Sequence, residues 1–203
     1  MYITNRETDP ATGSAYIIEY SLSTPFDIST ANISFSGGTP KGTAITCAAE
    51  GVGQMTLPHA IEFKSDGTMM YVMDNQNKRV EQFTLSEAWN SATLSHDNFF
   101  AVTNETQIRG LAFKPDGTRM YVIGAQKEIV YQYTLTTPWD VATAGSRVSS
   151  PDLTSDENDP RNIQFNSDGT IMYIGGSGGD EINKYTLSSA YAVSYTHLRA
   201  HET

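Results

Sequence analysis

Three side chains that could bind or activate a substrate recur at one position of the sequence. They are His59, Arg109 and Arg161, separated by 50 and 52 residues. Each stands four residues before a phenylalanine, at the expected start of a β-strand. A guanidinium group presents a rigid fork of N–H donors that suits carboxylate and phosphate groups, and an imidazole exchanges protons near neutral pH. The three residues therefore predict a site for an anionic or carboxylate ligand.

The same neighbourhood allows a simpler interpretation. Acidic residues lie close to the two arginines in the sequence, namely Glu105, Glu157 and Asp159. Ion pairs between such residues at a solvent-exposed rim contribute little to stability or function. The sequence leaves both interpretations of Arg109 and Arg161 open.

No constellation for catalysis or metal binding stands out beyond these residues. His59 and His96 occupy different places in the repeat described below, and Cys47 has no neighbouring base that would activate it as a nucleophile. The acidic residues between positions 152 and 159 lack the spacing of a calcium-binding loop. From the sequence we assign no catalytic residue, no metal and no cofactor.

The elements that would position these side chains follow from an internal repeat. A Phe-x-x-Asp-Gly-Thr motif occurs at 63–68, 113–118 and 165–170, and each copy is followed by Met-Tyr-Val or Met-Tyr-Ile. Apolar residues two apart before the motif predict a first strand, Asp-Gly predicts a tight hairpin, and the consecutive apolar residues predict a second strand covered on both faces. A third strand is predicted around Tyr131, Tyr133 and Leu135, and a fourth near 98–103 and 147–153.

We predict an all-β fold, a β-propeller fragment of four-stranded antiparallel blades. A single such unit cannot bury both faces, and stacking against like units covers them. The repeats run from about 1–56, 57–106, 107–158 and 159–192, which corresponds to about four blades of roughly six to eight in a closed ring. Tyr121, Tyr133 and Trp139 are expected to pack between blades.

The two ends of the chain prompt separate expectations. Residues 193–203 abandon the repeat, and the codons that encode them can spell a transposase-based sequencing adaptor, so we interpret them as a non-native tail. At the other end, Met1-Tyr2-Ile3 is a second-strand motif without a preceding first strand. We therefore expect the chain to be cut at both ends.

The segment Ile108-Arg-Gly-Leu-Ala-Phe-Lys-Pro-Asp-Gly-Thr-Arg-Met-Tyr-Val122 resembles the YVTN and WD40-like bacterial propeller repeats. This resemblance extends from Met1 to about Ala192. It implies that the first strand of each blade is innermost and begins at the top face, so that His59, Arg109 and Arg161 ring the mouth of the central channel. Two loops that are longer than their counterparts, at 5–15 and within 37–53, would lie on that face. Propellers of this group include lactonases, oxidoreductase-associated modules and binding proteins.

The composition limits the range of partners. A net charge of −10 without clustered Lys or Arg argues against nucleic acid, and no apolar run is long enough to insert in a membrane. The favoured interpretation is a non-enzymatic binding or scaffold module of a larger exported, cell-surface or virion-associated protein, with an unknown ligand or protein on its top face. The alternatives are a lactonase-like hydrolase with catalytic residues partly outside this chain, and a carbohydrate-binding, lectin-like propeller.

Overall fold

The structure is a computed structural model that describes residues 2–5, 16–31, 43–46, 57–179, 181–193 and 198–199. Cys47 and most of the two enlarged loops lie outside these residues. The strands form four antiparallel sheets in sequence order. They are β1 (Tyr2–Asn5), β2 (Tyr16–Glu19) and β3 (Thr43–Thr46); β4 (Pro58–Phe63), β5 (Met69–Asp74), β6 (Arg79–Leu85) and β7 (Leu94–Ala101); β8 (Ile108–Phe113), β9 (Arg119–Gly124), β10 (Val130–Leu135) and β11 (Ala144–Ser149); and β12 (Pro160–Phe165), β13 (Ile171–Gly176), β14 (Ile182–Thr186) and β15 (Leu198–Arg199).

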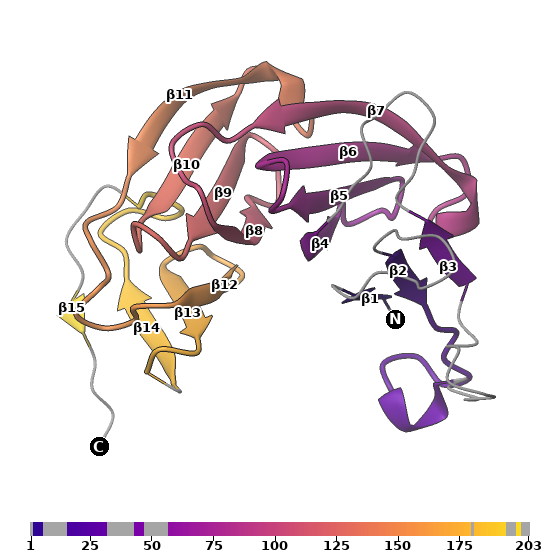
Figure 1. Cartoon of the computed structure of the whole chain (residues 1–203), viewed down its shortest axis with the longest axis horizontal. Coiled ribbons are helices and arrows are strands. Elements are labelled where there is room, and N and C mark those ends of the chain that lie inside the picture. Colours follow the sequence, from indigo (N-terminus) through magenta and orange to yellow (C-terminus); the bar gives the residue numbers. More distant parts are fainter. Residues whose placement is uncertain are drawn as a thin grey trace.

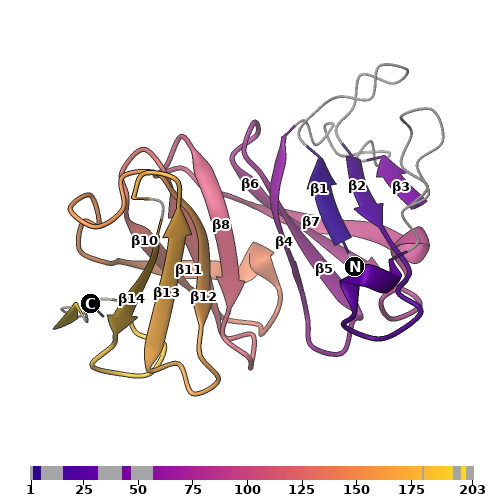
Figure 2. The same cartoon turned by 90° about the horizontal axis from the view of Figure 1, so that it is seen from below.

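The four sheets follow one another around an arc (Figure 1). In each complete sheet the first strand lies at the inner edge, so β4, β8 and β12 stand side by side on the concave surface (Figure 2). The later strands lead outwards, and β7 and β11 lie on the outer rim (Figure 1). This arrangement is that of propeller blades, which confirms the predicted all-β propeller fragment. We call the sheets blades 1 to 4 in sequence order.

The hairpin predicted between the first and second strands is confirmed. Gly67, Gly117 and Gly169 have φ of +73°, +72° and +70°, a conformation that suits glycine because it lacks a Cβ. The aspartate before each glycine braces the turn, as where Asp116 Oδ1 accepts the backbone N–H of Thr118 at 3.0 Å. The second strand that follows is buried on both faces in blades 2 and 3, as its consecutive apolar residues predicted. In blade 4 only Met172 and Ile174 of β13 are buried.

The predicted position of the fourth strand was late by several residues. It begins at Leu94 in blade 2 and at Ala144 in blade 3, directly after a 3₁₀ turn at Ser91–Thr93 (η2) or Val141–Thr143 (η3). The side chains of β7 alternate between half-buried and exposed, because this strand lies on the outer rim. Its weak apolar pattern therefore gave little indication of where the strand starts.

A cluster of three tilted aromatic rings joins each pair of neighbouring blades. Between blades 2 and 3, Tyr71 and Phe113 have ring centroids 4.4 Å apart, and Phe113 and Trp139 are 5.4 Å apart. The Tyr71 hydroxyl also donates to the Trp139 carbonyl at 2.6 Å. The same rings meet at the other two boundaries, in Tyr2, Phe63 and Trp89 and in Tyr121, Phe165 and Tyr191. Tyr133 of blade 3 also meets Phe100 of blade 2, with ring centroids 4.8 Å apart. The expected packing of Tyr121, Tyr133 and Trp139 between blades is thus confirmed.

The helical segments of the described chain are short 3₁₀ turns, and none is long or apolar enough to cross a bilayer. The segment interpreted as a non-native tail has residues placed in the fold. Val193 is fully buried and its N–H is bound by Gln132, as the N–H of Val141 is bound by Gln82 one blade earlier. Leu198–Arg199 pairs with β14 as β15. Val193 thus continues the repeat, while the adaptor origin of the segment stays a prediction.

Candidate functional site

The three residues singled out from the sequence occupy equivalent irregularities in the inner strands. The β4–β5, β8–β9 and β12–β13 pairings each shift register near the start of the inner strand, and the shifts span His59, Arg109 and Arg161. Such a bulge turns a side chain away from the regular alternation of the strand. At Gly110 an added Cβ would lie 3.0 Å from Asn162 Cα, so glycine lets neighbouring bulges approach closely. We call this part of the concave surface, where the inner strands begin, the channel mouth.

His59 and Arg109 meet across the boundary between blades 2 and 3. Arg109 Nη1 lies 3.3 Å from His59 Nε2 and 3.4 Å from Nδ1, and Arg109 Nη2 donates to Gln107 Oε1 at 3.0 Å. Because a guanidinium only donates, the imidazole nitrogen that it meets acts as an acceptor. The structure therefore brings together two of the three predicted residues.

Arg161 is held differently. Its Nη2 lies 2.5 Å from Asp159 Oδ2, and its Nε donates to Ser177 Oγ at 3.0 Å. A hydrogen bond from Ser177 contributes most to lowering the pKa of Asp159, and the ion pair with Arg161 and the nearby charge of Arg109 act in the same direction. For Arg161 the structure thus has the solvent-exposed ion pair of the simpler interpretation.

The other two carboxylates of that interpretation do not pair with the arginines. Glu105 and Glu157 are buried, with 2% and 1% of their surface exposed, and each accepts backbone N–H groups. The simpler interpretation, in which these carboxylates pair with the arginines at a solvent-exposed rim, is therefore wrong for Glu105 and Glu157. Sequence patterns do not indicate this burial, because it depends on the space beside Gly124 and Gly176 in the folded chain.

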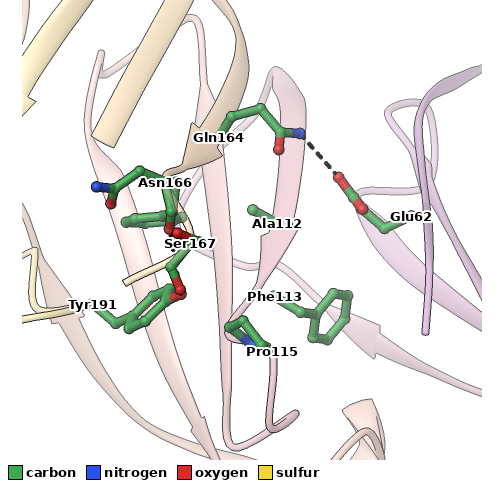
Figure 3. A pocket seen from close by; sticks show the side chains of 9 residues that line it. Glu62, Ala112, Phe113, Pro115, Gln164, Asn166, Ser167 and Tyr191 are labelled. Atoms are coloured by element: carbon green, nitrogen blue, oxygen red, sulfur yellow. Dashed lines mark hydrogen bonds between the residues drawn. The ribbon is translucent and has the colours of Figure 1, made fainter. Parts of the chain in front are cut away.

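A further polar contact spans the concave surface. Glu62 Oε1 accepts a hydrogen bond from Gln164 Nε2 at 3.3 Å, and these residues belong to blades 2 and 4 (Figure 3). The equivalent residue of blade 3 is the small Ala112, which leaves room for the contact. Burial raises the pKa of Glu62 to about 7, and the hydrogen bond from Gln164 acts in the opposite direction. Alignment of the repeats shows that Glu62 and Gln164 occupy equivalent positions. It does not predict that the two side chains touch.

A pocket of about 130 Å³ lies beside the Glu62–Gln164 contact (Figure 3). Aromatic rings and a hairpin turn form much of its wall, including Phe113, Pro115 and Tyr191. The concave surface therefore combines cationic donors at its mouth with an ionisable carboxyl group and a small pocket. The mouth lies where the inner strands begin and the pocket where they end, so the cationic donors could bind an oxyanion and Glu62 could transfer protons only as separate groups.

Solved structures with the same fold include three bacterial propellers. The periplasmic gluconolactonase of Pseudomonas aeruginosa is 14% identical with a TM-score of 0.56, and the match covers 98% of this chain and 50% of that one. Putative 6-phosphogluconolactonases of Bacteroides uniformis and Bacteroides fragilis are each 14% identical with a TM-score of 0.56; their matches cover 93% and 98% of this chain and 51% and 66% of theirs. The chain thus spans about half to two thirds of these proteins. At this identity the likeness shows the fold alone.

No curated protein sequence matches this chain significantly. The family described as "Lactonase, 7-bladed beta-propeller", however, matches residues 27–202, which is most of the chain. This match overturns the favoured interpretation of a non-enzymatic binding or scaffold module and supports the alternative of a lactonase-like propeller. The chain belongs to the lactonase family of seven-bladed β-propellers.

Proposed function

We propose that the protein hydrolyses a lactone at the channel mouth. The observation that carries the proposal is the contact between His59 and Arg109, which places a permanent cation beside a proton acceptor on the concave surface. Family membership supports the reaction class, and the names of the gluconolactonase neighbours suggest sugar-acid lactones as substrates.

The chemistry of ring opening fits these two residues. Water attacks the acyl carbon of the lactone, the carbonyl oxygen becomes an oxyanion, and the ring C–O bond then breaks. Arg109 would turn from His59 to donate to this oxyanion, because a cationic N–H donor stabilises the negative charge that develops there. The imidazole released by that movement accepts the proton of the attacking water and returns it to the departing alkoxide. The product is a hydroxy acid with a free carboxylate.

The first test measures hydrolysis by the purified chain. D-glucono-δ-lactone and 6-phosphogluconolactone are the substrates, and acid release is followed against the spontaneous rate. We expect Arg109→Ala to lower kcat/KM by about a hundredfold or more, the loss usual for an oxyanion donor. Arg161→Ala is the matched control. Because Asp159 already engages Arg161, its loss should cost less than about threefold.

Two results would overturn the proposal. One is hydrolysis of both lactones at no more than the spontaneous rate. The other is an Arg109→Ala variant that hydrolyses them as fast as the parent chain does. A preference for the phosphorylated lactone would assign its phosphate to the same cationic mouth.

A further inference from the structure

A buried carboxylate lies beneath the channel mouth in blade 3. Glu105 Oε1 accepts the N–H groups of Thr106 at 2.8 Å and Gln107 at 3.0 Å, and its Oε2 accepts the N–H of Lys127 at 3.2 Å. The carboxylate thus ties the segment before β8 to the β9–β10 hairpin. Gln107 in turn accepts from Arg109 through its side chain. A chain of contacts therefore runs from Glu105 through Gln107 to Arg109.

Blade 4 repeats this chain of contacts with the same residue spacing. Glu157 Oε1 accepts the N–H groups of Asp159 and Gly178, both at 2.8 Å. The Asp159 side chain then binds Arg161. In both blades the buried glutamate accepts the backbone N–H of the residue two positions after it. The side chain of that residue binds the arginine, which follows two positions later.

Blade 2 holds the backbone before its mouth residue through a different carboxylate, although Leu57 has no polar side chain to bind His59. The position equivalent to Glu105 is Met55, which lies outside the described residues. Here Asp74, at the end of β5, supplies the carboxylate. Its Oδ1 accepts the N–H groups of Leu57 at 3.3 Å and Asn77 at 3.4 Å, which are the counterparts of Gln107 and Lys127. Leu57 stands two residues before His59.

A glutamate before the inner strand and an aspartate at the end of the second strand exclude each other sterically. We call these the two carboxylate positions. The counterparts of Asp74 are Gly124 in blade 3 and Gly176 in blade 4. A Cβ added at Gly124 would lie 2.1 Å from Glu105 Cγ, and one at Gly176 would lie 2.3 Å from Glu157 Cδ. Where the loop before the inner strand supplies the carboxylate, the second strand of the blade must therefore end in glycine, as β9 and β13 do. From blade to blade the two residues differ together, as Glu105 with Gly124 in blade 3 and Met55 with Asp74 in blade 2, and each pair contains one carboxylate.

We propose that Asp74, Glu105 and Glu157 are positioning residues for the channel mouth. Each fixes the backbone that leads into a bulge and so sets the direction of His59, Arg109 or Arg161. Both oxygens of Glu105, and one oxygen each of Glu157 and Asp74, accept backbone N–H groups. These carboxylates therefore act through the mouth residues and not on a substrate. An uncompensated buried N–H is costly, so the leading segment shifts when its acceptor is removed. For catalysis this inference rests on the proposed lactone hydrolysis.

The test moves the carboxylate of blade 3 from position 105 to position 124 in the purified chain. Glu105→Ala should lower kcat/KM for glucono-δ-lactone by about tenfold or more, because a small displacement of a catalytic donor has effects of this size. Gly124→Asp alone should impair the chain, since its Cβ has no space beside Glu105. The double variant Glu105→Ala/Gly124→Asp restores the arrangement of blade 2 and should recover kcat/KM to within about threefold of the parent.

A second readout does not depend on hydrolysis. The rate at which phenylglyoxal modifies Arg109 is followed by peptide mass spectrometry, with Arg161 as the internal reference. We expect Glu105→Ala to raise the Arg109 rate about fivefold or more relative to Arg161, and the double variant to restore it. If the chain proves inactive towards lactones, this readout still decides the positioning role.

A matched control separates positioning from general stability. Glu81→Ala removes an equally buried carboxylate from β6, where it contacts His96 and not the channel mouth. It should lower Tm while leaving the lactone kinetics and the Arg109 modification rate unchanged. The proposal is overturned if Glu105→Ala lowers Tm alone, as Glu81→Ala does, or if Gly124→Asp fails to rescue either readout.

Discussion

Replacing Glu62 by glutamine should remove a pH dependence of stability that the concave surface imposes. Burial raises the pKa of this carboxyl from 4.5 to about 7. In that interval the folded chain keeps a proton that the unfolded chain has released. The stability that the protonated Glu62 carboxyl contributes is therefore fully present below about pH 4.5 and is lost as the pH rises through about 7.

The magnitude follows from the interval between the two pKa values. From 4.5 to about 7, at about 1.4 kcal/mol per pH unit, the upper limit is roughly 3 kcal/mol. Glu62 is partly exposed at the channel surface, so solvent screening reduces this to about 1–2 kcal/mol. Glutamine resembles the protonated carboxyl group in shape. Glu62→Gln should thus match the parent at about pH 4 and exceed its free energy of unfolding by about 1–2 kcal/mol at about pH 8.

The assay is urea unfolding followed by the fluorescence of Trp89 and Trp139 at several pH values. Gln164→Ala provides a second arm. Its amide lowers the pKa of Glu62, so its loss should move the stability change to higher pH. Equal pH dependence in the parent and in Glu62→Gln would refute the reasoning, because the carboxyl would then titrate alike in both states.

Two further predictions concern the junctions between blades and are checked by the same unfolding assay. Tyr71→Phe leaves the Trp139 carbonyl of the next blade without its tyrosine donor and should cost about 1–2 kcal/mol. Tyr173→Phe, whose hydroxyl bonds to none of the described residues, should cost less than about 0.5 kcal/mol. Gly117→Ala places a Cβ 2.3 Å from the Trp139 indole, in a backbone with φ of +72°, and should lower the free energy of unfolding by about 2 kcal/mol or more. In the control Gly145→Ala the nearest atom lies 3.8 Å from the added Cβ, and the free energy of unfolding should change by less than about 0.5 kcal/mol. Equal losses in a variant and its control would contradict either prediction.

The repeat in the sequence was enough to determine the fold class and much of the core. Period-two apolar residues, an Asp-Gly turn and a consecutive apolar run are local signals, and each was confirmed where strongest, as in β8 and β9. Alignment of the repeats also put His59, Arg109 and Arg161 at equivalent places, because residues equally spaced in equal blades occupy equal positions. The finer assignment to YVTN and WD40-like repeats, the number of blades and the exported location stay predictions.

The tertiary structure decided which partner each of those residues takes. Arg109 meets His59 while Arg161 meets Asp159, although both arginines occupy the same bulge in their blades. Likewise, Glu62 bonds to a residue two blades away because Ala112 between them is small. The periodicity of one strand says which side chains share a face. It does not give the distance between strands of different blades, and that distance determines which charges pair, which become buried and which remain available for chemistry.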